Sequence, residues 1–451
     1  MSKIKSVYNC GSCDYQTIKW LGCCPSCNEW DTFAEQKSAP AFASLATDGK
    51  KNIHHSTKIA ALSDITSAPH QRIVSGISEW DRVLGGGIIP GSFLIVTGDP
   101  GIGKSTLLLQ VSATLADRFT VLYFSSEESL EQVKLRAQRL GLGHSKLLFS
   151  DQAQLESIIQ TAIAHKPDVL IIDSIQNCYA SNVQTFPGSI GQLREASFHL
   201  MRLAKEHAIA VIVSGHINKE GTIAGPKTLE HMVDAVFYLQ GEDRLDTRVL
   251  RAVKNRFGAV NEIGFFQMEG DGLKEVPNIN QHLLDQASYA PGSVLISALE
   301  GSRPLLLELQ ALTIPSKLTM PQRVITGIDH KQVILIAAIL EKYLQIKLSS
   351  QDIFFKISGG FSMKESSLDL GIALALLSSY FNQSIPEKSL ALGEISLTGQ
   401  IKSINQITIH INEAHKFGIE RVYLAKNQKV DNKKLNTQRF SNVYELLSLF
   451  T

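Results

Sequence analysis

The chain has 451 residues, a length that suggests about two to four domains, and its 44% hydrophobic and 19% charged residues are typical of globular proteins. With 44 Lys and Arg against 43 Asp and Glu, the formal charge is +1, so no global positive field indicates nucleic-acid binding. No apolar run is long enough to span a bilayer, and no apolar core follows the basic N-terminus as in a signal peptide. We therefore expect a cytoplasmic protein that has no membrane partner.

Two C-x2-C pairs stand near the N-terminus: Cys10 with Cys13, and Cys24 with Cys27. Four thiolates on two tight turns can close a tetrahedron around Zn²⁺, and a segment as short as 1–32 needs a metal to hold it together. Cys23 could replace Cys24, but two symmetric C-x2-C knuckles are the commoner geometry. The sequence therefore predicts a zinc ribbon with four cysteine ligands over residues 1–32.

Residues 33–66 are rich in Ala, Ser, Lys and Thr and show no sustained apolar period, which predicts a linker. Beyond it, Arg72–Pro90 combines a strand start, a short helix and a glycine turn. This segment leads into the apolar run Ser92–Thr97, which is typical of a buried parallel strand.

The eight residues after that run read GDPGIGKS, which is the G-x-x-x-x-G-K-[ST] pattern of a phosphate-binding loop. The glycines allow consecutive N–H groups to point at phosphate oxygens, the lysine brings a positive charge to the β- and γ-phosphates, and the serine offers a hydroxyl to Mg²⁺. A helix is predicted directly after the loop, over Ser105–Ala116. The loop residues expected to bind ATP and Mg²⁺ are Gly98, Asp99, Pro100, Gly101, Ile102, Gly103, Lys104 and Ser105.

Polar residues follow three further apolar strands of the same region. Thr120–Ser125 is followed by Glu127 and Glu128, where a general base for water attack is expected; Glu127 is the first choice and Glu128 the alternative. Val169–Ser174 contains Asp173, which we expect to hold Mg²⁺ beside the loop serine.

The third of these strands, Ala208–Gly215, is followed by His216, a candidate γ-phosphate sensor that could equally be a simple strand cap. Helices are predicted over Ser150–His165 and Ser189–His207. Because strands and helices alternate, the region is predicted to be α/β, with a parallel, doubly wound sheet.

The ordered motifs GDPGIGKS, SSEES and VLIIDS resemble the RecA/KaiC-type ATPases. After them stands KNRFG, formed by Lys254, Asn255, Arg256, Phe257 and Gly258. Coming after a zinc ribbon and a RecA-like core, this motif resembles the signature of the RadA (Sms) family of bacterial DNA-repair proteins. Residues 223–234 and 291–312 are similar to that family too, so the resemblance covers essentially the whole chain.

This resemblance implies a DNA-dependent ATPase of recombinational DNA repair, which moves on single-stranded DNA and promotes branch migration of recombination intermediates. It implies ATP, Mg²⁺ and Zn²⁺ as cofactors, the recombinase RecA as a partner, and a homo-oligomer, most simply a hexameric ring. The KNRFG residues would bind DNA and couple it to ATP hydrolysis. The implied RecA-like ATPase domain spans 67–284.

The region 285–451 resembles the Lon protease domain, an α+β fold with helices expected over Lys331–Leu344 and Ser367–Phe381 and strands over Asp352–Ser358 and Arg421–Ala425. Ser367 falls at or next to the position of the nucleophile, but Thr408 stands where the lysine base should be and Lys402 comes too early. A serine without its base is only a hydroxyl, so we expect a proteolytically inactive scaffold.

The end of the chain is locally basic, with eight Lys or Arg against three acids over residues 402–439. Such a patch can bind phosphate backbones, although it can also be an ordinary solvated surface. Two other functions stay open at this point: a KaiC-like, ATP-regulated switch that binds a protein partner, and a Lon-type peptidase.

Overall fold

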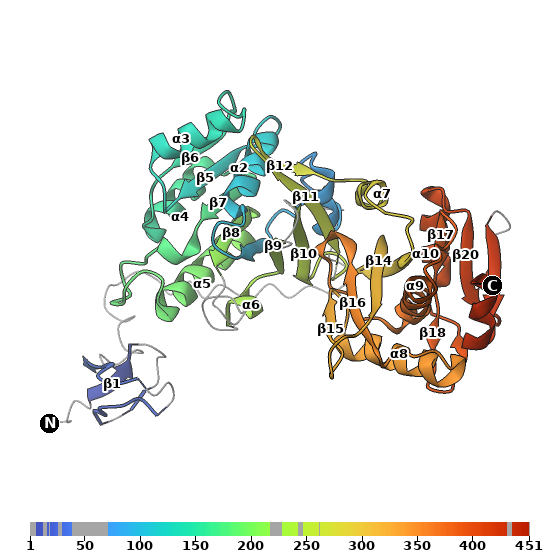
Figure 1. Ribbon diagram of the computed structural model, residues 1–451. Coiled ribbons are helices and arrows are strands. Elements are labelled where there is room, and N and C mark those ends of the chain that lie inside the picture. The colour runs from blue at the N-terminus through green and yellow to red at the C-terminus, as the bar shows by residue number, and fades with distance from the viewer. Residues whose placement is uncertain are drawn as a thin grey trace, which may run out of the picture. The chain divides into compact units, whose positions relative to one another are not determined.

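The computed structural model describes residues 6–11, 16–17, 19–25, 29–37, 71–216, 228–241, 247–260, 262–430 and 435–450 (Figure 1). The chain divides into two compact units, Met1–Leu239 with Ala252–Ala259, and Gln240–Arg251 with Val260–Thr451. Residues 240–251 and 260–284, which the sequence assigned to the ATPase domain, lie in the second unit on this division. The boundary at residue 285 therefore stays a prediction about domains.

A small antiparallel sheet in the order β2-β1-β3 contains the first residue of the first cysteine pair. Strand β1 (Ser6–Cys10) pairs with β2 (Gln16–Thr17) and with β3 (Phe33–Lys37), which brings Cys10 opposite Phe33. Its apolar centre contains Cys10, Cys24 and Phe33. Strand β3 and Phe33 lie in residues that the sequence assigned to the linker, so this small sheet extends past the predicted end of the zinc ribbon at residue 32.

The core of the first unit is the parallel part of a nine-stranded sheet whose other strands, β10 to β12 (residues 247–275), pair antiparallel with one another. Its strands are β4 (Phe93–Gly98), β5 (Val121–Ser125), β6 (Leu148–Ser150), β7 (Val169–Asp173), β8 (Ala210–His216) and β9 (Ala235–Gly241). They lie in the order β9-β4-β8-β7-β5-β6, and each pair of neighbours is parallel. The carboxyl ends of the central strands therefore meet at one edge, which is where ligands bind in open sheets of this kind.

Helices flank this sheet. They are α1 (Ser78–Val83), α2 (Lys104–Leu115), α3 (Leu130–Arg139), α4 (Leu155–His165), η2 (Ile175–Asn177), α5 (Ile190–His207) and α6 (Thr228–Met232). The apolar stripes of α4 and α5 share a core cluster with one face of β4, β5 and β7. Helix α2, in contrast, lies against β4, β5 and β7 directly after the glycine loop (Figure 1).

Most expected elements of this unit are found within one or two residues of their predicted bounds. The exception is the predicted helix over 150–165, which was wrong at its start, because Ser150 ends strand β6 and helix α4 begins only at Leu155. Strand β6 is short and half-exposed, so it lacks the all-apolar run that marks the other strands.

The second unit is built on a mixed sheet in the order β15-β16-β14-β13-β17-β20-β21. Its strands are β13 (Ser293–Glu300), β14 (Arg303–Pro315), β15 (Arg323–Thr326), β16 (Gln351–Ile357), β17 (Ser389–Ala391), β20 (Arg421–Ala425) and β21 (Asn436–Phe440). A short pair, β18 (Glu394–Ile395) with β19 (Ile401–Lys402), stands outside this sheet. The remaining strands are β10 (Thr247–Asn255), β11 (Ile263–Glu269) and β12 (Gly272–Glu275). Strand β11 pairs antiparallel with β10 and with β12.

Helix α9 (Asp369–Phe381) is the central helix of this unit, and its residues from Asp369 to Ser378 are all buried. It packs with α8 (His330–Leu344) on one side of the sheet, while α10 (Ile407–Lys416) belongs to the cluster on the other side. The remaining segments are α7 (Ile279–Asp285), η3 (Ser358–Gly360), η4 (Ser366–Leu368) and η5 (Val443–Leu449). This α+β unit agrees with the fold class expected for residues 285–451.

Across the described ranges, no helix has the length and apolar character needed to cross a membrane.

Candidate nucleotide-binding site and KNRFG loop

The glycine loop joins the end of β4 to the start of α2. Gly98, Gly101 and Gly103 all have positive φ, at 152°, 76° and 113°, so the backbone turns in a way that L-residues resist. At Gly98 a Cβ would lie 2.1 Å from the carbonyl oxygen of Leu239 in the neighbouring strand β9. The loop can therefore follow this path only with glycine at its first position, and its last glycine caps helix α2.

Lys104 reaches back over this loop from the first residue of α2. Its ammonium donates to the carbonyl oxygens of Gly98 and Asp99, each at 2.9 Å. Burial lowers the pKa of Lys104, although the neighbouring Asp173, Glu127 and Asp99 act in the opposite direction. The lysine thus lies within the electrostatic reach of the carboxylates expected in the site, and Ser105 follows it in the first turn of α2.

Asp173 ends strand β7 and is held by the strands on either side of it. Its Oδ2 accepts a hydrogen bond of 2.8 Å from the Tyr123 hydroxyl on β5, and its Oδ1 accepts one from the Ser214 hydroxyl on β8. Burial and this carboxylate together raise the pKa of Tyr123 well above its usual value. Sequence reasoning missed Tyr123 and Ser214, whose signal was a polar group inside an otherwise apolar strand, where a hydroxyl needs a partner.

The two glutamates after β5 have different surroundings. Glu127 accepts a hydrogen bond from the Ser174 hydroxyl, directly after Asp173, and acts electrostatically on Lys104. Glu128 instead forms an ion pair with Arg136 on helix α3. Glu127 is therefore on the side of the loop lysine and the strand-end aspartate, whereas the charge of Glu128 is engaged by a helix.

His216 ends strand β8 and is the register partner of Gly98, so its backbone lies beside the start of the glycine loop. Its side chain is outside the described residues. The role of His216 as a γ-phosphate sensor stays a prediction.

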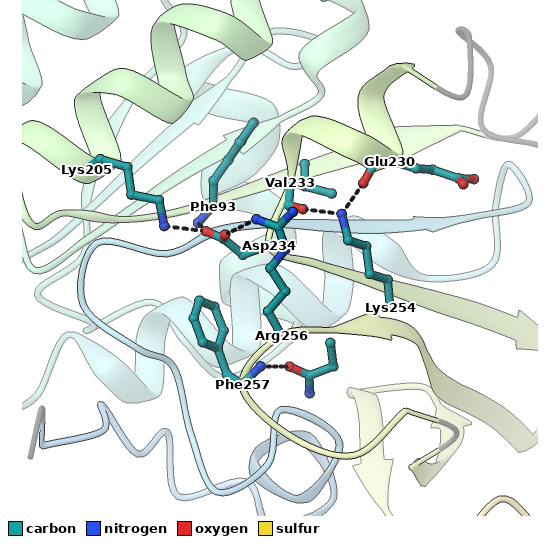
Figure 2. A network of polar contacts seen from close by, with 9 residues as sticks. Phe93, Lys205, Glu230, Val233, Asp234, Lys254, Arg256 and Phe257 are labelled. Carbon is teal, nitrogen blue, oxygen red and sulfur yellow. Dashed lines mark hydrogen bonds and ion pairs between the residues drawn. The ribbon is translucent and has the colours of Figure 1, made fainter. Parts of the chain in front are cut away.

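The KNRFG residues span the end of β10 and the turn that follows it. Lys254 donates to the backbone carbonyls of Glu230 and Val233, the latter at 2.7 Å, and so closes the end of helix α6 (Figure 2). Burial, followed by the charge of Arg256, lowers the pKa of Lys254. This lysine is thus bound to backbone within the same unit, which its motif alone did not indicate.

The rest of the motif packs on the glycine turn that follows α1. Asn255 accepts a 2.9 Å hydrogen bond from the Phe257 N–H, and a Cβ at Gly258 would lie 3.0 Å from the Cα of Gly85. Arg72 donates to the Phe257 carbonyl at 2.7 Å and to the carbonyls of Leu84 and Gly87. Asn255 and Gly258 therefore shape the turn, while Arg256 is exposed at its surface and Phe257 is half-buried.

Arg256 is paired with Asp234, which comes directly before strand β9. The Arg256 Nη1 lies 3.3 Å from Asp234 Oδ1, and the Lys205 ammonium on helix α5 lies 2.7 Å from Oδ2 (Figure 2). Sequence reasoning missed both Asp234 and Lys205. Asp234 ends the family-like stretch 223–234 without a role assigned to it, Lys205 stands in no motif, and a contact between residues 22 or more positions apart is not visible in the sequence.

Two of the four expected zinc ligands are described. Cys10 and Cys24 are both fully buried in one cluster, whereas Cys23 is only half-buried. The Cys10 thiol also contacts the Thr32 hydroxyl at 3.1 Å. Cys13 and Cys27 lie outside the described residues. The burial of Cys24 beside Cys10 supports it over Cys23 as the ligand.

In the second unit, the residues considered as a peptidase pair have other surroundings. Ser367 donates its hydroxyl to Glu365 at 2.9 Å, and Thr408 is exposed on helix α10. The basic residues of 402–439 are spread over β19, α10, β20, β21 and their connections, with Lys433 and Lys434 outside the described residues. They do not share one secondary-structure element, which the charge count could not reveal.

Three family models match the chain. An AAA domain model matches residues 63–222, a model of the subunit ChlI of Mg-chelatase matches 326–428, and a rubredoxin metal binding domain model matches 8–35. The first covers the glycine loop, Glu127 and Asp173, and the last covers all four cysteines of the two C-x2-C pairs.

Several curated proteins named DNA repair protein RadA are similar over nearly the whole chain. The protein of Streptococcus pyogenes is 44% identical over 95% of this chain and 94% of its own length. The Halalkalibacterium halodurans protein is 43% identical over 94% and 93%, and the Bacillus subtilis protein is 41% identical over 94% and 93%.

Two solved structures are similar to part of this chain. The ATPase domain of G40P is 17% identical, covers 48% of this chain and 95% of its own, and has a TM-score of 0.41. The RadB recombinase is 21% identical, covers 45% and 99%, and has a TM-score of 0.36.

Proposed function

This chain belongs to the family of the DNA repair protein RadA, and from that membership we propose that it is a DNA-dependent ATPase that processes recombination intermediates. We propose further that ATP hydrolysis drives movement along single-stranded DNA and promotes branch migration. The similarity spans the zinc ribbon, the ATPase core and the C-terminal unit alike, which supports a shared activity of the whole chain.

The ATPase activity rests on the arrangement of the glycine loop and the strand ends. The backbone from Gly98 to Gly103 would surround the phosphates, and Lys104 would exchange its two carbonyl partners for phosphate oxygens. Ser105 and Asp173 would hold Mg²⁺, with Tyr123 and Ser214 orienting the carboxylate. When bound, the cation neutralises charge that develops on the transferred phosphoryl group.

Glu127 would accept the proton of the attacking water. The observation that carries the function is the position of Glu127. It accepts a hydrogen bond from Ser174, the residue after Asp173, and it interacts with the charge of Lys104. The expected base, magnesium ligand and phosphate ligand therefore lie near one another. A general base must be within reach of its water, and the position of Glu127 after the end of β5, beside Asp173, supports this role.

The KNRFG turn would couple DNA to the nucleotide through the P-loop strand. Arg256 donates its backbone N–H to the Asp234 carbonyl at 3.1 Å, and Asp234 exchanges hydrogen bonds with Phe93, the first residue of β4. A force on Arg256 would therefore act on the strand whose other end is Gly98. Phosphates of DNA or of a neighbouring subunit's ATP would be the ligands of this loop, in a ring that we take to be hexameric.

Zinc would be held by Cys10, Cys13, Cys24 and Cys27, and would stabilise a module that is too small to fold on a core alone. The proposed partners are single-stranded and branched DNA and the recombinase RecA. Proteolysis is not proposed, because Ser367 donates to a carboxylate and Thr408 stands in place of a base.

A labelled three-strand DNA intermediate tests this function. With ATP, the full chain should lengthen the heteroduplex arm, and Lys104→Ala should lose both this extension and ATP turnover, because the phosphates lose their buried charge. Reactions without ATP serve as the control. Arm extension that continues in Lys104→Ala would refute the ATP-driven movement.

A further inference from the structure

One carboxylate, Asp234, holds two cationic side chains that come from different elements (Figure 2). Lys205 comes from the last turn of α5 and Arg256 from the KNRFG turn, and they bind different oxygens of the same carboxyl group. We propose that Lys205 and Arg256 form a phosphate-binding pair, and that Asp234 is the counter-ion that holds both when no phosphate is bound. The identity of the ligand rests on the proposed function, whereas the pairing of these two residues is new.

Asp234 is fixed in place and cannot follow a ligand. Its Oδ2 accepts a 3.0 Å hydrogen bond from the Phe93 N–H, and its own N–H donates to the Phe93 carbonyl at 2.8 Å. Its side chain is only 6% exposed. Burying a carboxylate costs free energy unless it is paired and hydrogen-bonded, and here the two cations and the strand backbone supply those partners.

The cations, in contrast, face the solvent. The side chain of Lys205 is 51% exposed and that of Arg256 is 58% exposed, and the group of three carries a net charge of +1. An ammonium has three donors and a guanidinium five, so both retain donors beyond those used on Asp234. A phosphate with several terminal oxygens can bridge two such neighbours.

Two further contacts suit a nucleic-acid backbone. The Lys205 ammonium lies 6.0 Å from the centre of the Phe257 ring, so an apolar face stands beside the charged pair. Aromatic rings next to backbone-binding cations are a common feature of single-strand binding. Lys254 is not assigned to the pair, because its ammonium donates to the carbonyls of Glu230 and Val233 rather than to Asp234.

Salt-dependent binding to single-stranded DNA tests the pair on the full chain. The logarithm of the binding constant falls with the logarithm of salt concentration, and its slope should become shallower by about 0.7 for each phosphate that the variant no longer neutralises. Lys205→Ala should show this change, while Lys205→Arg should retain the wild-type slope. Arg202→Ala is the matched control, because Arg202 lies one turn earlier on α5, is 53% exposed and pairs with Glu206 instead.

Asp234→Asn should act in the opposite direction. An amide oxygen can still accept from Phe93, but the two cations lose their counter-ion, so DNA affinity at low salt should rise. A merely structural role of the cluster would weaken binding in both variants. Thermal unfolding of each variant identifies any that has lost its fold, and Lys205→Ala, at the surface, remains informative if Asp234→Asn unfolds.

ATP turnover without DNA distinguishes the two sources of phosphate. If the pair binds a neighbouring subunit's nucleotide, Lys205→Ala should lower turnover at saturating ATP and leave the DNA slope unchanged. Wild-type chain that neither binds DNA nor is stimulated by it would refute the proposed function, yet this turnover measurement would still test the pair. If Lys205→Ala matches Arg202→Ala in both measurements, the phosphate-binding pair is wrong.

Discussion

At the scale of single residues, the site depends on which of two adjacent glutamates faces the loop. The sequence favoured Glu127 and kept Glu128 as the alternative. Their partners distinguish them, since Glu127 accepts from Ser174 beside Asp173 and Glu128 pairs with Arg136. Neither partner could be identified from the sequence, because each contact depends on how a neighbouring element packs.

Glu127→Gln and Glu128→Gln make the same chemical change at neighbouring positions. We expect Glu127→Gln to lower kcat for ATP hydrolysis by about 10² to 10⁴-fold with little change in KM, because an amide cannot accept the water's proton. Glu128→Gln should lose only an ion pair with α3 and keep most of its turnover. Steady-state ATPase assays measure both, and equal losses in the two variants would contradict the assignment.

His410 makes stability depend on pH in the second unit. Its ring contacts the Ser297 hydroxyl at 2.8 Å, and burial lowers its pKa to about 4. In the unfolded chain the histidine pKa is about 6.5. Between about pH 6.5 and pH 4 the unfolded chain therefore binds a proton at His410 that the folded chain does not bind, so stability is lost as pH falls through this range.

Relative to His410→Gln, the wild-type chain should lose about 2–3 kcal/mol of stability between pH 7 and pH 4.5. Asp369, whose pKa burial raises to about 6, acts with the opposite sign, but both proteins contain it and its effect cancels in the comparison. Thermal unfolding of both proteins at the two pH values measures the difference. Parallel pH profiles would show that His410 is not the titrating group.

At the scale of elements, the strands that end at the site were predicted well because they are continuous apolar runs. Strands β4, β5 and β7 lie within a residue of their expected bounds, and Asp173 is found at the predicted strand end. Strand β6 was not predicted, and neither was strand β10, whose last two residues are the first two of KNRFG. Short or half-exposed strands carry a weak hydrophobic pattern. Likewise, Asp234 and Lys205 meet only through the packing of α5 against the sheet.

Substituting alanine at two glycines of the loop should lower the stability of the fold by different amounts. A Cβ at Gly101 meets nothing within 4 Å, so Gly101→Ala should cost only the positive φ, about 1–2 kcal/mol. At Gly98 the methyl would collide with the Leu239 carbonyl, and β4 and β9 would have to separate. Gly98→Ala should therefore lower Tm clearly more than Gly101→Ala, and similar Tm values would contradict this account of the β4–β9 contact.

At the scale of the whole molecule, the motifs indicated the order of the modules, while the compact units divide the chain at other points than the predicted domain limits. Motifs in sequence indicated a zinc ribbon, a P-loop core and an α+β unit, and relatives at 41–44% identity extend over the same range. The chain, however, passes from one compact unit to the other within strand β10, between Arg251 and Ala252. No composition shift marks such a point, because a single strand serves both units.

The measurement that tests the central claim most directly is the steady-state ATPase rate of the zinc-loaded full chain, with and without single-stranded DNA at fixed salt. If hydrolysis at Lys104, Asp173 and Glu127 is coupled to DNA through the KNRFG turn, the rate should rise clearly when DNA is added. An unchanged rate, with ATP still bound, would contradict a DNA-driven motor and would favour a switch that acts on a protein partner.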